Sequence, residues 1–153
     1  MNALARAALA GAATGARSFT GLAALTLATP PGSATQPDRS LGHTWVKGLF
    51  TLAAAQELVM DKLPQAPSRL GLMGLGARVT TGAAVGTVAA RREPGASGAA
   101  VTAAAVAVGT AVAAAWLGAT WRRVAARRFG TDYVGAGAED LLAVLLAWTA
   151  TRV

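Results

Sequence analysis

Six ionisable residues interrupt stretches of sequence that are otherwise apolar, and their side chains are the best candidates for chemistry in this chain. They are Arg17, Lys47, Glu57, Arg78, Glu139 and Asp140. Guanidinium and carboxylate groups can pair with each other, and they can also bind an ion or a polar solute. Three of these residues, Glu57, Glu139 and Asp140, lie near segment ends, as does Asp61. Their carboxylates could also bind a metal or act as general bases. No spacing among them matches a catalytic motif, so we expect no enzyme.

The elements that carry these residues have the composition of a membrane protein. The chain has 153 residues, of which 54% are hydrophobic and only 14% are charged, and its mean hydropathy is +0.45. Soluble domains devote about a quarter of their residues to charged side chains, which cover a wet surface. The length suits one domain, and the low charge favours a lipid environment with the bilayer as the main partner.

Five apolar stretches are long enough to cross a bilayer as helices, which requires roughly 20 residues each. They cover residues 3–29, 41–60, 70–90, 97–121 and 133–151. The fourth is the clearest, because it contains no charge and ends at Trp121 followed by two arginines, a typical boundary signal. The sequence therefore predicts an all-α fold, a transmembrane bundle of about five helices in one domain.

Charges inside such helices predict pairing. A charge near the bilayer centre costs on the order of 3 kcal/mol, so these side chains tend to face the bundle interior. At about 1.5 Å per residue, the charges of four helices lie about 7–16 Å from the same side of the membrane. We expect Arg17 and Arg78 to pair with Glu57, Glu139 and Asp140, and the uncharged fourth helix to form an outer wall.

An internal repeat relates the two arginines. Gly15-Ala-Arg-Ser-Phe-Thr-Gly21 reappears 61 positions later as Gly76-Ala-Arg-Val-Thr-Thr-Gly82. The match favours duplication of a two-helix unit and places Thr20 and Thr81 in equivalent positions. Gly11 with Gly15, and Gly82 with Gly86, also have the small-xxx-small spacing that packs helices in lipid.

Several classes of site are excluded or disfavoured. The absence of cysteine removes disulfides, thiol nucleophiles and thiolate metal sites, and a single histidine, His43, rules out the usual zinc ligand sets. The net charge of +7 and the pI near 11.5 raise the question of nucleic acid. The basic residues cluster between apolar stretches and do not line one face, which is a membrane pattern. We expect no cofactor, no metal and no nucleic acid.

Orientation follows from the basic residues that flank the stretches. Those on the N-terminal side of a five-helix bundle are Arg6, Lys62, Arg69, Arg122, Arg123, Arg127 and Arg128, and the other side has Arg39, Arg91, Arg92 and Arg152. The positive-inside rule then predicts a cytoplasmic N-terminus and an outside C-terminus. The alternative is a cleaved signal peptide at the start of the chain, against which Arg17 argues because it falls within the apolar region.

Three motifs resemble those of an uncharacterised family of small bacterial multipass membrane proteins, known as a domain of unknown function. They are Gly-Ala-Arg-Ser-Phe-Thr in the first stretch, Glu57-x-x-x-Asp61-Lys-x-Pro-x-x-Pro-Ser-Arg69 after the second, and Glu139-Asp140 in the last. The family commonly has proline after the first threonine, where this chain has Gly21, which leaves the bend of the first helix open. The resemblance implies a place in the bacterial inner membrane and no defined activity.

Two functions remain open for the intramembrane polar cluster. Its expected members are Arg17, Thr20, Glu57, Asp61, Arg78, Thr81, Glu139 and Asp140. One interpretation is a small transporter or channel-like protein in which the cluster binds or passes an ion or small polar solute. The other is a structural or assembly subunit whose buried ion pairs only fix helix packing. Five short helices enclose little volume, so a homo-oligomer could complete a pore.

Overall fold

The computed structural model describes residues 2–34, 36–61, 70–93, 98–131 and 133–152, and within these ranges the chain is all-helical, as expected. The helices are α1 (Ala3–Ala16), α2 (Thr20–Ala28), α3 (Asp38–Leu41), α4 (Thr44–Met60), α5 (Leu72–Arg91), α6 (Ala100–Phe129) and α7 (Tyr133–Arg152). The third and fifth expected helices agree with α5 and α7 within two residues. The second begins later than expected, because the short helix α3 precedes α4.

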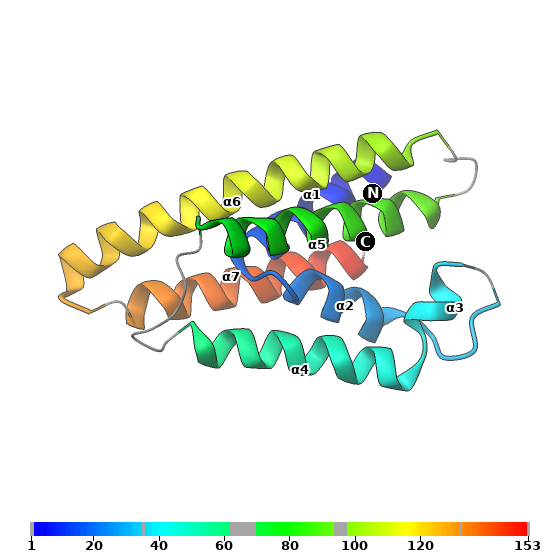
Figure 1. Cartoon of the computed structure of the whole chain (residues 1–153), viewed down its shortest axis with the longest axis horizontal. Coiled ribbons are helices and arrows are strands. Elements are labelled where there is room, and N and C mark those ends of the chain that lie inside the picture. Colours follow the sequence, from blue (N-terminus) through cyan, green and yellow to red (C-terminus); the bar gives the residue numbers. More distant parts are fainter. Residues whose placement is uncertain (1, 35, 62–69, 94–97, 132, 153) are drawn as a thin grey trace.

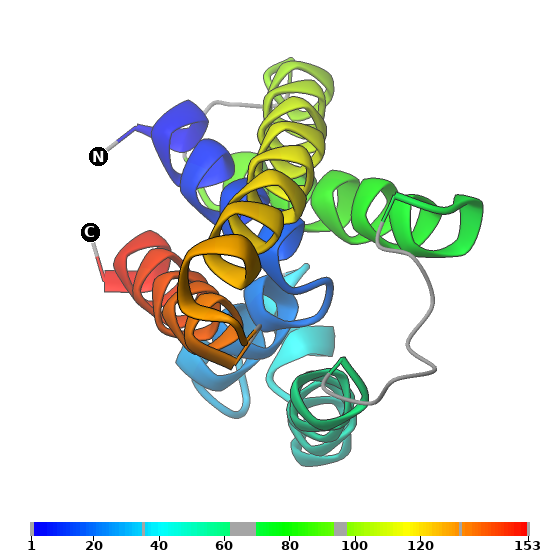
Figure 2. The same ribbon diagram turned by 90° about the vertical axis from the view of Figure 1, so that its left-hand side faces the viewer.

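All helices except the short α3 lie side by side along the long axis of the molecule and alternate in direction (Figure 1). Both chain termini therefore lie toward the same end (Figure 1), and a view along that axis places them on the same side of the bundle (Figure 2). We call this the terminal end. A small cavity there is lined by Arg6 of α1, Leu25 of α2, Ala89 of α5 and Thr151 of α7, so the four helices meet at this end.

The first expected helix, over residues 3–29, is wrong in its continuity. The chain leaves helical geometry at Arg17, whose φ of −143° and ψ of 115° are extended, and α2 then returns antiparallel to α1 (Figure 1). The two helices have 14 and 9 residues, which correspond to lengths of about 21 and 14 Å. Because this segment turns back, the expectation of termini on opposite sides of a five-helix bundle does not hold.

The fourth apolar stretch forms a helix at the edge of the bundle with few of its residues buried, and this helix is longer than expected (Figure 2). Helix α6 continues beyond residue 121 to Phe129 and ends at Gly130, whose positive φ of 69° forms a C-cap. It packs chiefly against α1 and α5. The outlying helix is α4, which packs mainly on α2 and of whose residues only Val46 is buried.

Close contact between small residues explains how α6 packs against α1 and α5. Its inward face is a row of four buried alanines, Ala103, Ala107, Ala111 and Ala115. A Cβ on Gly86 of α5 would lie 2.5 Å from the carbonyl oxygen of Ala103, and one on Gly11 or Gly15 of α1 would overlap the backbone of α6. The predicted small-xxx-small pairs thus bring both helices into backbone contact with α6.

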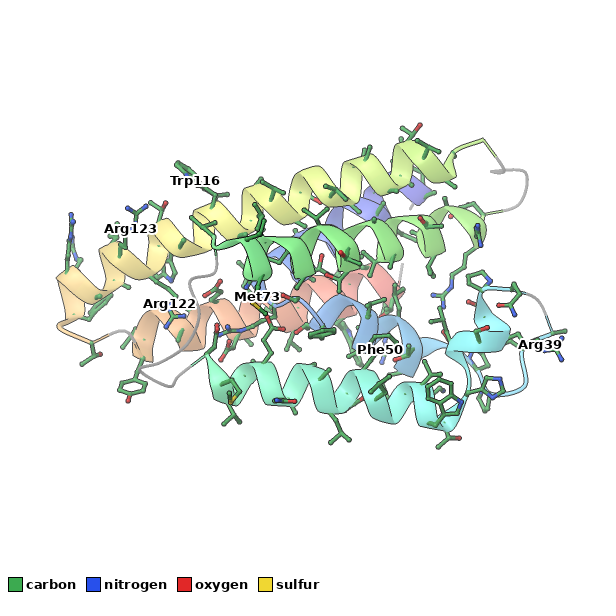
Figure 3. The ribbon with its side chains drawn as sticks, in the orientation of Figure 1. Arg39, Phe50, Met73, Trp116, Arg122 and Arg123 are labelled. Atoms are coloured by element: carbon green, nitrogen blue, oxygen red, sulfur yellow. The ribbon has the colours of Figure 1, made fainter. Side chains whose placement is uncertain are left out.

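The distribution of side chains is inverted relative to that of a soluble domain. The largest fully buried side chains are Arg17, Val85, Thr14, Thr26 and Thr29, whereas Trp, Leu, Val and Met side chains lie exposed along α4, α6 and α7. Sticks drawn on the ribbon show, for example, Trp116 projecting away from the bundle (Figure 3). Among the described residues, α6 and α7 are long and apolar enough to cross a membrane, which by itself is weak support for a membrane location.

Candidate functional site

Arg17 occupies the tip of the α1–α2 hairpin and is completely buried. Its Nε donates a hydrogen bond of 2.6 Å to Oδ1 of Asp140, which lies on α7, and Nη2 reaches the same oxygen. Its Nη1 forms an ion pair with Oδ2 of Asp61, the residue that caps the end of α4. The break in the first segment therefore aims a guanidinium at carboxylates from two other helices.

A further arginine joins from α6. Nη1 of Arg122 lies 3.7 Å from the same Asp61 oxygen that pairs with Arg17. The neighbouring residue, Arg123, points away from the bundle, whereas Arg122 points toward α7 (Figure 3). Asp61 thus bridges two arginines, one from the hairpin tip and one from α6.

Glu57 of α4 caps the beginning of α2. Its two carboxylate oxygens accept hydrogen bonds from the backbone N–H groups of Ser18 at 2.8 Å and Phe19 at 3.1 Å. These amides precede the first residues of α2 and have no partner inside a helix. The positive end of the helix dipole favours an anion at this place.

Arg78 of α5 donates a hydrogen bond to the backbone on the α1 side of the break. Its Nε donates to the carbonyl oxygen of Gly15 at 2.9 Å, and its Nη1 donates to that of Gly74, also at 2.9 Å. Nη2 lies 3.8 Å from Oε1 of Glu57. The Arg78–Glu57 pair therefore holds the Gly15 carbonyl near the end of α1 and the two amides that precede α2. We call Arg17, Glu57, Asp61, Arg78, Arg122 and Asp140 the tip network.

A separate set of cations holds the opposite end of α2. Lys47 Nζ donates to the carbonyl oxygen of Thr29 at 2.6 Å, and Arg92 Nη2 donates to its hydroxyl at 2.6 Å. Arg92 also pairs with Asp38 at 2.8 Å. Positive groups at the carboxyl end of a helix offset its dipole, so α2 is fixed at both ends by side chains from other elements.

The structure brings together Arg17, Glu57, Asp61, Arg78 and Asp140 from the expected cluster, and the other three expected members have different surroundings. Glu139 is 4% exposed on α7, beside Asp140. Thr81 donates to the carbonyl oxygen of Ala77, within its own helix. Thr20 is the first residue of α2 and lines a groove between α2 and α7.

Sequence reasoning missed Arg122 and the backbone groups of the hairpin tip. Arg122 was assigned to a loop because Trp121 resembles a membrane boundary. Residues 122–129 contain no proline or glycine, and Gly130 follows Arg127 and Arg128, which is the usual signature of a helix end. That signal would have placed Arg122 on a helix, whereas no comparable signal marks the break at Arg17.

The repeat also differs between its two copies. Arg17 stands where the chain breaks, while Arg78, 61 positions later, lies within the continuous helix α5. Both arginines nevertheless reach the hairpin tip, one from its own backbone and the other from the neighbouring helix. The similar sequences therefore do not adopt the same local structure.

The charged groups of the tip network contact one another directly. It combines three guanidinium groups with three carboxylates, and Glu139 lies next to it. Among the described residues no group of histidine, cysteine, aspartate and glutamate side chains could hold a metal ion. The arrangement suits ion pairing, proton exchange at a carboxylate or binding of a small charged solute.

Comparisons with known protein families, with curated proteins and with solved structures find no match for this chain. The features that bear on function are therefore the tip network, the groove between α2 and α7, and the exposed apolar surface.

Proposed function

We propose that the chain is a multi-pass integral membrane protein in which α4 to α7 cross the bilayer and α1 and α2 form a re-entrant hairpin. Exposed apolar residues on α4, α6 and α7 support this, since soluble monomers rarely expose large continuous apolar surfaces. The crossing helices have 17 to 30 residues, or about 25–45 Å; α5, α6 and α7 match or exceed a hydrocarbon core of about 30 Å, and α4 is about 5 Å shorter.

Within that setting we propose a small transporter or channel-like role, with the tip network as the site where an ion or small polar solute binds. The observation that carries it is the buried break between α1 and α2, whose backbone groups are held by Glu57 and Arg78. Non-helical backbone at membrane depth is tolerated only inside protein or beside a polar cavity. Broken helices of this kind form the binding sites of many secondary transporters.

The hairpin provides a simple means of coupling a solute to movement. Glu57 holds the hairpin tip through two backbone amides, and Arg78 holds it through a carbonyl oxygen. An anion that competes with the Glu57 carboxylate for these amides would weaken this attachment. Release of α2 from α4 would then open a path at the tip network.

A structural or assembly subunit is the second candidate, and one observation favours it. Arg17 is completely buried, and its guanidinium forms ion pairs with Asp140 and Asp61. Such pairs can serve only to fix the positions of helices. A protein of this kind would need its network for folding and would pass no solute.

Flux across reconstituted vesicles distinguishes the two candidates. The probes are protons, followed with an enclosed pH-sensitive dye, chloride, and urea as a neutral polar solute. We expect the unmodified protein to pass at least one of them, and expect Glu57→Gln and Arg78→Gln to abolish that flux while helix content is retained. Arg123→Gln, an exposed change next to Arg122, is the control. Flux that is the same in all four proteins, or absent in all, would exclude transport of these probes through the tip network.

A further inference from the structure

A groove between α2 and α7 has the form of a lipid-binding site. It has a volume of about 550 Å³ and is lined by Thr20, Ala23, Ala24, Leu27 and Ala28 of α2 and by Val144, Ala147, Trp148, Thr151 and Arg152 of α7. We propose that this groove binds one acyl chain of an anionic phospholipid, whose phosphate lies at Arg152. The inference rests on the membrane location proposed above.

The groove exists because small side chains face each other where two helices meet. Four of its ten lining residues are alanines, and hydroxyl groups occur only near its two ends, at Thr20 and Thr151. Most of its wall can therefore offer van der Waals contact and no hydrogen bond. Its volume falls in the range of about 300–1,000 Å³ that is typical of small-molecule sites.

The groove is nearly as long as the hydrocarbon layer of one bilayer leaflet is thick. It extends from Thr20 to Ala28 on α2 and from Val144 to Arg152 on α7, and eight residue steps of helix correspond to about 12 Å. Half of a hydrocarbon core about 30 Å thick is about 15 Å. A chain that enters from the terminal end would thus reach Thr20, the first residue after the hairpin tip.

The polar end of the groove complements a phosphate. The Arg152 guanidinium lies 3.8 Å from the centre of the Trp148 ring, and Trp148 is 55% exposed. Arginine binds phosphate oxygens through paired hydrogen bonds, and tryptophan favours the level of the lipid headgroups. Arg152 forms no ion pair with a described acidic residue, which leaves its charge available to a headgroup.

A helix from a second copy of the chain fits the groove less well. A helix is about 10 Å wide, and 12 Å of its length occupies about 900 Å³, which exceeds the groove volume of about 550 Å³. An acyl chain is much thinner and can follow the alanine-lined floor. Shape and charge therefore favour a lipid.

Quenching of Trp148 by brominated lipids tests the inference. Trp45, Trp116 and Trp121 are replaced by phenylalanine, and the protein is placed in phosphatidylcholine bilayers that contain a variable fraction of chain-brominated phosphatidylglycerol or chain-brominated phosphatidylcholine. We expect half-maximal quenching at a fraction about fivefold lower for the anionic lipid, since one arginine near the surface contributes attraction of that size. Arg152→Gln should remove the preference, and Ala147→Leu should remove it by filling the groove.

Matched controls lie elsewhere on the surface. Arg128→Gln removes an exposed charge near the far end of α6, and Ala113→Leu adds bulk to an exposed position of α6; both should keep the preference. Equal quenching by the two lipids, a preference that survives Arg152→Gln, or its loss on adding inorganic phosphate would overturn the inference. Insertion is checked separately by labelling single cysteines from either side. A protein that inserts without a lipid preference contradicts only the groove, whereas one that does not insert contradicts the proposed membrane location.

Discussion

Arg17 illustrates how one buried charge can organise several helices. It has no contact with water, and its partners, Asp61 and Asp140, come from the end of α4 and from α7. Attraction between the charges offsets the cost of burying them only while all partners are present. Removal of one member leaves another charge buried and uncompensated.

We predict that Arg17→Leu lowers the free energy of unfolding by about 3–5 kcal/mol, the usual cost of breaking a buried pair. The double variant Arg17→Leu with Asp140→Leu should lose less than the two single changes together, because each removes the partner that the other leaves unpaired. Titration with a denaturing detergent, followed by circular dichroism, measures both. Additive losses would mean that the two side chains are not coupled.

Glu57 should stabilise the hairpin tip locally, through the two backbone amides that donate to it. Glu57→Ala leaves the amides of Ser18 and Phe19 without their acceptor, so we predict a loss of about 1–2 kcal/mol, as for other helix caps. Hydrogen exchange at these two amides should accelerate. The adjacent exposed change Gln56→Ala serves as the control. Unchanged exchange in Glu57→Ala would mean that the carboxylate does not hold the hairpin.

Most residues of the tip network were predictable from the sequence, whereas their backbone partners were not. Arg17, Arg78 and Asp140 attract attention because charge is rare in apolar sequence. The hydrogen bonds that two backbone amides donate to Glu57 depend on a break that no proline marks. Local sequence does not reveal it, because the similar segment around Arg78 remains within the continuous helix α5, whereas the break at Arg17 is stabilised by side chains from α4 and α5.

Among the elements, α6 determines how the others pack. Its row of alanines receives glycines from both α1 and α5, so three backbones approach one another without long side chains between them. Lipid offers no hydrophobic driving force for helix association, which makes such close packing important. The glycine spacing was visible in the sequence, but it did not identify the partner helix.

Two glycines in helices provide a matched test of this packing. A Cβ at Gly15 would overlap the backbone of Ala111, whereas a Cβ at Gly48 of α4 has nothing within 4 Å. We predict that Gly15→Ala lowers the free energy of unfolding by about 1–3 kcal/mol through overpacking. Gly48→Ala should raise it by about 0.5–1 kcal/mol, because alanine favours helix. Equal effects in thermal unfolding would contradict the assigned α1–α6 contact.

The whole molecule has both termini at one end, which changes the topology expected from hydropathy. The five apolar stretches predict an odd number of crossings, but the first forms a hairpin, which does not cross the bilayer in the topology proposed above. Among the described residues, Arg6 joins Arg39, Arg91, Arg92 and Arg152 at the terminal end, and Arg122, Arg123, Arg127 and Arg128 lie toward the other end. The cytoplasmic N-terminus stays a prediction.

Labelling of single cysteines tests the topology, and the cysteine-free chain suits it. We predict that Asn2→Cys and Ser40→Cys react with a membrane-impermeant maleimide from the same side of the membrane, and that Thr131→Cys reacts from the opposite side. Gly11→Cys, buried between α1 and α6, should stay unlabelled if it folds. Reaction of positions 2 and 131 from one side, with position 40 on the other, would instead restore the five-crossing arrangement.

The contact between Arg17 and Asp140 joins residues 123 positions apart in the chain, and this separation has a consequence for biogenesis. The ribosome completes the hairpin long before it makes α7, so Arg17 has only Asp61 of its two carboxylate partners until the last helix emerges. A nascent chain that stops after α6 would lack the Asp140 contact, and its hairpin tip would be held less firmly. Synthesis of the final helix therefore completes the charge pairing that begins at the first hairpin.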